Sequence, residues 1–214
     1  MSRAVTVVDY GIGNLYSVTR ALEVCGASVR LTANHEHIED AERVVLPGVG
    51  AFEDGMKGLT QRAQADPVRR FIASGRPFLG ICVGMQLLFD VGEEFGEHAG
   101  LGIIPGRVRP IPATGIDGKA HRIPHIGWNA LVTPAGRPDW SATLLRDLPP
   151  GPAVYFVHSF APEPAHEKHR LADCYYDGRR ISAAVQADNA SGCQFHPEKS
   201  GPTGLRILEN FLRL

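Results

Sequence analysis

The sequence predicts an α/β fold in which an open, mostly parallel sheet carries helices on both faces and has an antiparallel extension. Through the first half of the chain, short apolar runs alternate with helical patterns, which is typical of a parallel sheet covered on both faces. The second half differs, because 11 of the 16 prolines lie between Pro105 and Pro164 and Asp177-Gly178 is a strong hairpin signal. No repeat, charge block or linker divides the chain, so we expect a single domain over residues 1–214.

The first half is expected to alternate strands and helices. The apolar run 4–8 predicts a buried strand, and the periodic segment 15–24 predicts a helix that ends at a glycine. Two further apolar runs predict strands at 28–31 and 43–46, and the second of them is stopped by Pro47-Gly48. The remaining elements are a helical stretch up to Ser74 that is interrupted near Pro67, a strand over 77–81 and a helix over 83–90.

The second half is expected to hold short strands and one closing helix. Segments 171–176 and 180–186 flank the Asp177-Gly178 turn and predict a hairpin. An amphipathic pattern over 203–214 predicts a C-terminal helix. Further short strands are expected at 153–157 and 192–195.

The composition argues against several classes of protein. The chain has 214 residues, of which 43% are hydrophobic, and a formal net charge of −1, so it can build a core and has no charge excess favouring nucleic acid or an anionic membrane. No apolar run reaches the ~20 residues of a membrane helix, and the N-terminal run is too short for a signal peptide. We therefore expect a cytoplasmic protein whose four cysteines are free.

Cys82 is the strongest candidate for a nucleophile. It lies in Gly80-Ile81-Cys82-Val83-Gly84, between a predicted strand and a predicted helix, and Gly-x-nucleophile-x-Gly is the pattern of a nucleophile elbow. A helix N-terminus favours the thiolate, and the Val83 amide would point into the same space. The Pro-Gly loop after the third strand offers a second donor for an oxyanion, the amide of Val49 or Gly50.

The base is expected in the segment Gln194-Phe195-His196-Pro197-Glu198-Lys199-Ser200. Pro197 restricts His196 to an extended conformation, in which His196 and Glu198 point to the same side. Glu198 would then orient the imidazole while His196 takes the proton of Cys82. A lone cysteine or a lone His-x-Glu pair is usually structural, but three segments here follow strands at their carboxyl ends, where open α/β sheets place active sites. We therefore predict a Cys-His-Glu site.

Other motifs are weaker. Gly11-Ile12-Gly13 begins like a dinucleotide fingerprint, but Tyr16 stands in place of the third glycine and no acidic residue closes the second strand. The sequence contains no Gly-x-x-x-x-Gly-Lys-Ser/Thr run for binding phosphate. His35/His37 and His166/His169 have metal-ligand spacing, but their polar neighbours predict solvated loops, so no metal site is expected.

The same motifs resemble those of class I, triad-type glutamine amidotransferases, and more narrowly those of the glutaminase subunits of imidazole glycerol phosphate synthase. The elbow and the His-Pro-Glu segment are shared across class I, whereas Asp9-Tyr10-Gly11-Ile12-Gly13-Asn14 and Gly127-Trp128-Asn129 point to the narrower group. The resemblance runs nearly end to end, and its other segments are 46–50, 79–86, 124–126, 155–160 and 194–200.

The resemblance implies a glutaminase, and we expect no cofactor. Cys82 would be the nucleophile, His196 the base and then the acid, and Glu198 the orienting carboxylate, so that glutamine passes through a γ-glutamyl thioester to glutamate and ammonia. The residues implied in oxyanion or substrate binding are Val49, Gly50, Val83, Gln86, His158 and Ser159. Phe160 stands where the pattern often has tyrosine.

The resemblance also implies a partner, because the chain shows no site for a sugar-phosphate acceptor. In this family ammonia passes to a (β/α)8-barrel cyclase subunit that acts on a phosphoribulosyl-formimino carboxamide nucleotide. The products are imidazole glycerol phosphate and an aminoimidazole carboxamide nucleotide, in histidine biosynthesis. We expect a heterodimer whose glutaminase turns on when the partner binds nucleotide, with an interface formed by Tyr10, Asn14, Trp128, Tyr155 and Lys199.

Alternatives stay open from the sequence alone. A sister amidotransferase serving aminobenzoate or anthranilate synthesis would carry the same motifs, as would a free γ-glutamyl hydrolase. A non-catalytic binding module would keep the fold, although the intact Cys82, His196 and Glu198 argue against it. For Trp128 and Tyr155, a place in the core is an equally ordinary role.

Overall fold

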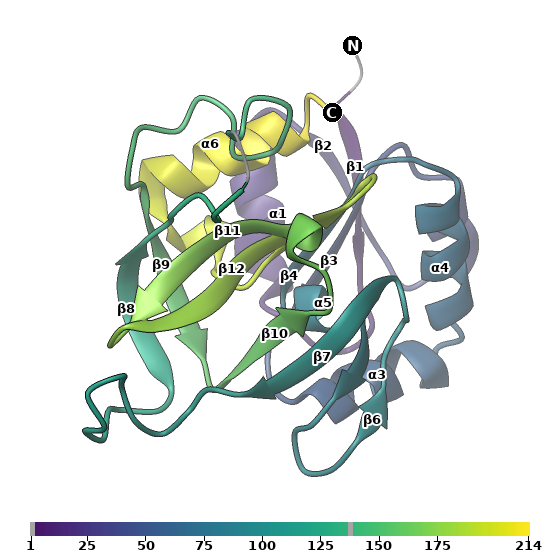
Figure 1. The fold of residues 1–214 in the computed structure, drawn as a ribbon. Helices are drawn as coiled ribbons and strands as arrows, with labels where there is room; N and C mark the ends of the chain where they lie inside the picture. The colour runs from purple at the N-terminus through teal and green to yellow at the C-terminus, as the bar shows by residue number, and fades with distance from the viewer. Residues whose placement is uncertain (1–2, 137–138) are drawn as a thin grey trace.

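The predicted α/β class is confirmed by the computed structural model, which describes residues 3–136 and 139–214 (Figure 1). Its largest sheet has five strands in parallel pairing, and two more strands join it through antiparallel pairs. The parallel strands are β1 (Ala4–Val8), β2 (Ser28–Thr32), β3 (Val44–Gly48), β4 (Phe78–Cys82) and β13 (Ala190–Cys193). The antiparallel strands are β11 (Arg170–Tyr176) and β12 (Arg179–Ala187). The order across the sheet is β11-β12-β13-β4-β3-β1-β2, so β4 and its neighbours lie at the centre.

Helices cover both faces of this sheet. The helices are α1 (Leu15–Val24), α2 (His35–Glu39), α3 (Phe52–Gln61), α4 (Ala65–Ala73), α5 (Val83–Gln86) and α6 (Gly201–Phe211). Helix α1 packs on α6, and α4 packs on both α2 and α3; the two groups lie on opposite sides of the sheet (Figure 1). Every residue of β3 and β4 is buried, as expected for central parallel strands. No helix of the described residues is long and apolar enough to span a bilayer.

The proline-rich part of the chain forms two further sheets beside the main one. One has the order β10-β7-β5-β6, from β5 (Phe89–Gly92), β6 (His98–Ala99), β7 (Ile104–Pro110) and β10 (Phe160–Pro164). The other pairs β8 (His125–Ala130) with β9 (Ala153–His158) in antiparallel register. Two prolines, Pro162 and Pro164, lie in β10 at the end of its sheet, where a missing N–H is tolerated.

The hairpin predicted at Asp177-Gly178 is confirmed. Both turn residues have positive φ, 45° and 78°, as a tight hairpin turn requires, and β11 pairs with β12 on either side. The closing helix is also confirmed, although it runs from Gly201 to Phe211 rather than over 203–214. The last predicted strand lies two residues earlier than expected, at Ala190–Cys193.

The helix predicted over 83–90 is wrong beyond its first turn. Helix α5 ends at Gln86, and the chain then becomes β5. The backbone carbonyl of Leu88 accepts from the amides of Ile103 and Ile104 at 2.8 and 2.9 Å, so tertiary partners replace the helical ones. The run Leu87-Leu88-Phe89 is fully buried, and a continuous apolar run does not distinguish a helix from a strand.

Three other predicted element boundaries or assignments differ from the structure. Pro47-Gly48 does not stop the third strand, because β3 continues through both residues in parallel register with β4. The helical break lies at residues 62–64 rather than near Pro67, which occupies the first turn of α4, where a missing N–H costs no bond. The loop predicted for the histidine pairs holds only for His166: His35 and His37 lie in α2, and His169 ends a 3₁₀ helix, Glu167–His169.

Candidate active site

Cys82 lies at a sharp turn between the end of β4 and the start of α5. Its φ of 53° is in the left-handed region, which is unfavourable for a residue with a side chain and marks a strained elbow. The flanking glycines allow the turn to close: a Cβ on Gly80 would lie 2.5 Å from the Gly84 carbonyl oxygen, and one on Gly84 would overlap the Leu46 carbonyl oxygen. The glycine spacing therefore serves close packing of the elbow against β3.

The end of β3 lies directly beside this elbow. In the parallel register Gly48 is the partner of Cys82, so the chain that follows, Val49-Gly50, starts next to the sulfur-bearing residue. Gly50 has a φ of 97° with open space around its Cα, a conformation that favours glycine. Val49, Gly50 and Val83 all line the pocket that contains Cys82, so their amides are the candidate oxyanion donors.

His196 and Glu198 form a buried pair at the end of β13. Nδ1 of His196 lies 2.8 Å from Oε1 of Glu198, and both side chains are almost inaccessible. Nε2 of His196 is buried without a hydrogen-bond partner among the described residues, which leaves it able to exchange a proton with Cys82. Burial disfavours the imidazolium, but the interactions with Cys82 and Glu198 outweigh it and raise the pKa of His196 to about 9. His196 is therefore protonated at neutral pH.

The pocket around Cys82 has a volume of about 230 Å³. The structure brings together here the predicted residues from four separate segments of the chain. Its lining consists of Val49, Gly50, Cys82, Val83, Gln86, Glu94, Pro124, Val157, His158, Ser159, Phe160 and His196. The arrangement combines a candidate nucleophile, a protonated candidate acid and candidate oxyanion donors, which is what acyl transfer from an amide requires.

Glu94 is a lining residue that the sequence reasoning missed. Its Oε2 accepts a hydrogen bond from the backbone N of Phe52 at 2.9 Å, which caps the N-terminus of α3, where Ala51 offers no side-chain cap. This contact fixes a carboxylate in a pocket that also holds amide and carbonyl groups. A carboxylate there is complementary to the ammonium group of an amino acid. The Glu93-Glu94 pair in the sequence gives no local signal of that role.

His158 belongs to a buried histidine pair that fixes one wall of the pocket. Its Nδ1 donates to the Phe160 carbonyl oxygen at 2.9 Å, and its Nε2 accepts from Nδ1 of His125 at 3.0 Å. Burial lowers the pKa of His158 to about 3 and that of His125 to about 4, so both rings are neutral at pH 7. Neutral rings make this donor order possible, because each then has one N–H and one acceptor nitrogen.

We predict that acid destabilises the protein through these two histidines. Their pKa values lie below the ordinary value near 6.5, so the unfolded chain binds more protons than the native one between about pH 6.5 and pH 4. Stability is fully present above that range and is lost as the pH falls through it. His125→Asn should reduce the proton uptake on unfolding by about one proton. Urea unfolding at pH 7 and pH 5 measures this, and an unchanged pH dependence in the variant would contradict it.

The other three cysteines differ from Cys82. Cys25, Cys174 and Cys193 are buried free thiols, and none of the three lines the pocket. Burial raises the pKa of Cys25 to about 11 and that of Cys174 to about 12, and it raises the pKa of Cys193 further. Such thiols are poor nucleophiles at neutral pH.

The residues predicted to form a partner interface are not all on the surface. Trp128 is 58% exposed and its ring lies 6.1 Å from that of Tyr155, which is partly exposed. The backbone of Tyr155 accepts from the N of His196, and the exposed Lys199 ends the following 3₁₀ helix, so these residues surround the site. Asn14 caps α1 through Ser17.

Tyr10 was expected at the partner interface, but its side chain is buried, with 1% of its surface exposed. Its hydroxyl fills the space in front of Gly48, where a Cβ would lie 2.5 Å from it. A side chain packed against the end of β3 cannot contact a partner in this conformation. The residue therefore supports the strand beside Cys82 rather than a docking surface.

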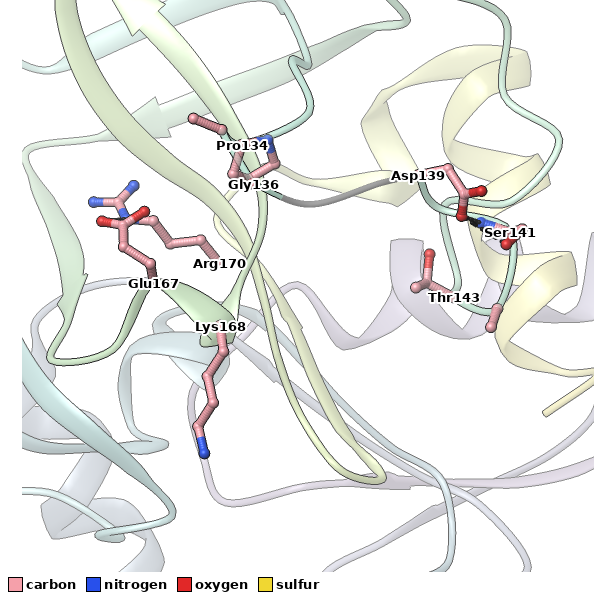
Figure 2. Close-up of a pocket in the computed structure, with 10 residues that line it drawn as sticks. Pro134, Gly136, Asp139, Ser141, Thr143, Glu167, Lys168 and Arg170 are labelled. Carbon is pink, nitrogen blue, oxygen red and sulfur yellow. Dashed lines mark hydrogen bonds and ion pairs between the residues drawn. The ribbon is translucent and has the colours of Figure 1, made fainter.

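A larger cavity of about 620 Å³ lies elsewhere, beside the 3₁₀ helix Glu167–His169 (Figure 2). It shares no lining residue with the Cys82 pocket. The Ser141 hydroxyl donates to Asp139 and the Thr143 hydroxyl donates to the Trp140 carbonyl, so both are engaged locally. Within residues 3–136 and 139–214, no group of three or more His, Cys, Asp or Glu side chains is arranged to hold a metal ion.

The chain is similar to known proteins over almost its whole length. The family described as glutamine amidotransferase class-I matches residues 6–214. Imidazole glycerol phosphate synthase subunit HisH 1 of Legionella pneumophila (strain Lens) is 53% identical over 211 residues, which cover 99% of each chain. Subunit HisH of Syntrophotalea carbinolica is 47% identical over 210 residues, covering 97% of this chain and 98% of that one.

Solved structures agree at the level of the fold. The structure of PurLQS from Thermotoga maritima matches with a TM-score of 0.72 and 21% identity, over 100% of this chain and 99% of that chain. A crystal structure described as a glutamine amidotransferase matches with a TM-score of 0.71 and 18% identity, over 98% and 99% of the two chains. At these identities the likeness shows a common architecture.

Proposed function

The chain belongs to the class I glutamine amidotransferase family, in its HisH type, and we propose that it is the glutaminase subunit of an imidazole glycerol phosphate synthase in histidine biosynthesis. It hydrolyses glutamine to glutamate and ammonia. The observation that carries this function is the placement of Cys82 at a strained elbow in one pocket with His196, whose ring is held by the buried Glu198. Cys82, His196 and Glu198 act as a catalytic triad.

The reaction proceeds by covalent catalysis at Cys82. The Cys82 proton passes to His196, and the sulfur attacks the side-chain amide carbon of glutamine. The carbonyl oxygen becomes an oxyanion that the amides near Val83 and Val49-Gly50 stabilise. The protonated His196 gives its proton to the leaving ammonia, and a γ-glutamyl thioester remains on Cys82. His196 then accepts a proton from the attacking water and returns it to the Cys82 sulfur as the C–S bond breaks, so that glutamate leaves and the thiol is restored.

The pocket is suited to glutamine. Gln86, His158 and Ser159 line it beside the candidate nucleophile, and Glu94 supplies a fixed carboxylate for the amino-acid ammonium group. Phe160 contributes its backbone carbonyl, which accepts from both Gln86 and His158, so a tyrosine hydroxyl is not needed for that contact. We propose these residues as the substrate-binding set, together with Val49, Gly50 and Val83.

The ammonia is used by a second subunit, which we propose to be a (β/α)8-barrel cyclase in a heterodimer. Trp128, Tyr155 and Lys199 lie around the site, and Ile126 and Trp128 are both 58% exposed on the same face of β8. Large exposed apolar side chains next to an active site favour a protein partner. Helix α1, which Asn14 caps, contacts the 3₁₀ helix Pro197–Lys199, and we propose that Asn14 also belongs to the interface. The four unpaired cysteines support a reducing, cytoplasmic compartment.

The test is glutamate release by the chain alone, with the cyclase subunit, and with the cyclase and its nucleotide. We expect the complete complex to exceed the isolated chain about 10- to 100-fold, because the partner favours the active arrangement of the oxyanion loop. Full activity of the isolated chain would refute this gating, and no glutamate release under any condition would refute the function.

Surface variants locate the partner in the same assay. Trp128→Ala should weaken the activation, because an exposed aromatic at the centre of an interface is a typical energetic anchor. Val24→Ala is the matched control: it is 60% exposed at the far end of α1, away from the carboxyl edge of the sheet. Equal loss of activation in both variants would place the partner elsewhere.

A further inference from the structure

The Cys82 sulfur has a second polar neighbour besides His196. Gln194 follows β13, is completely buried, and anchors its backbone N to the Ala183 carbonyl at 2.9 Å. Its side-chain Nε2 donates to the Cys82 sulfur at 3.6 Å. The mechanism above does not use this contact, although it is a hydrogen bond to the reacting atom.

The orientation of the Gln194 amide is fixed by a chain of hydrogen bonds. Nε2 of Gln86 lies 3.1 Å from the Phe160 carbonyl oxygen and 3.0 Å from Oε1 of Gln194. A backbone carbonyl can only accept, so the Gln86 amide must present its NH₂ group there, and the same group donates to Oε1 of Gln194. The NH₂ group of Gln194 is then left to face the sulfur.

The first hydrogen bonds of this series, at His158 and His125, are also fixed in direction. The Phe160 carbonyl accepts a second bond from Nδ1 of His158, whose ring is in turn held by His125. Every group from His125 to Cys82 is therefore tied to the next by a donor of known direction. Gln86, His158 and Phe160 also line the substrate pocket, so the chain links the wall that receives the substrate to the nucleophile.

We propose that Gln194 is a positioning residue that orients the Cys82 sulfur toward the substrate and couples that orientation to the pocket wall. This inference rests on the proposed glutaminase function. A single rotatable bond separates the sulfur from the strained backbone, and a fixed N–H donor restricts the side chain to one rotamer before His196 acts. The alternative is that the buried Gln194 only fills space in the core. The experiment below separates this packing role from the positioning role.

The test compares Gln194→Met with wild type in complex with the cyclase subunit. Methionine has a similar length and no N–H donor, and Gln86 keeps its bond to the Phe160 carbonyl. We expect kcat for glutamate release to fall about 10- to 100-fold, as for loss of one hydrogen bond to a charged group. In a Cys82→Ala background, which has no sulfur to orient, glutamine affinity should change less than about 3-fold on adding Gln194→Met.

A second readout follows the sulfur without substrate. Iodoacetamide at pH 7 should alkylate Cys82 about tenfold more slowly in folded Gln194→Met than in wild type, with the site located by peptide mass spectrometry. The other thiols do not compete, since burial raises their pKa values. Gln64→Met is the matched control, because Gln64 is also completely buried but bonds to the Asp9 and Ala33 carbonyls.

Each outcome decides the proposal. Slower alkylation and lower kcat in Gln194→Met but not in Gln64→Met support it, and Gln194→Asn, which is one methylene too short, should repeat the result if the methionine variant does not fold. Unchanged alkylation, or a loss of glutamine affinity in the Cys82→Ala background as large as the loss in kcat, overturns it. If wild type with the cyclase releases no glutamate, the proposed function fails, while the alkylation comparison still tests Gln194.

Discussion

Replacing Cys82 with alanine should lower glutamine hydrolysis by at least about 10⁴-fold, because it removes the atom that forms the thioester. The fold should persist, since alanine fits wherever cysteine does and the elbow is closed by backbone contacts at Gly80 and Gly84. The complex should still make imidazole glycerol phosphate from added ammonium, because the acceptor chemistry belongs to the partner.

Two assays on the same sample check this prediction. Glutamate release measures the first activity, and product formation with glutamine or with ammonium salt separates the two nitrogen sources. Cys174→Ala is a suitable control, because that thiol is buried outside the pocket and should leave both rates near those of wild type. If the ammonium-dependent reaction disappears together with the glutamine-dependent one, Cys82 has a structural role.

Replacing Gly84 with alanine should have the second largest effect, and it should act on stability as well as activity. The new Cβ would overlap the Leu46 carbonyl oxygen, which is backbone of a fully buried central strand and cannot move aside. We expect the free energy of unfolding to fall by about 3 kcal/mol. A shift of about 1 Å in the elbow would also cost about 10²-fold in rate.

Gly75→Ala provides the matched control for that substitution. Gly75 lies in the connection between α4 and β4, before the strand that Gly84 follows; it has a φ of 79° and open space around its Cα. The substitution should cost about 1 kcal/mol from left-handed backbone alone and leave glutaminase activity unchanged. Urea unfolding and glutamate release measure both variants. Equal unfolding midpoints would show that the elbow has room for a side chain at Gly84.

The proposed function needs contacts that hold the pocket as well as the proposed triad. Glu94 connects the β5–β6 sheet to the N-terminus of α3, and the histidine pair connects β8 to the start of β10. Glu94 therefore holds the β5–β6 segment against α3, and the histidine pair holds β8, β9 and β10 together; residues of both parts line the pocket that contains Cys82.

Local patterns were sufficient to predict the triad candidates and the main sheet. The elbow around Cys82 needs glycines at fixed spacing, and the extended His196-Pro197-Glu198 segment places two side chains on one side through neighbouring dihedral angles. Alternation of apolar strands and amphipathic helices likewise depends on residues close in sequence, so it predicted a parallel sheet. One prediction that failed, the helix over 83–90, concerns an apolar run in which helix and strand have the same pattern.

By itself, the sequence determined the α/β class, the nucleophile candidate and its base. Only the tertiary structure decided that Gln194 donates to a sulfur 112 residues away, that Glu94 lines the pocket and that Tyr10 is buried behind β3. The physical reason is that side-chain partners distant in sequence are selected by packing between elements. A periodic pattern specifies which face of an element is buried, but not which residue of another element lies against it.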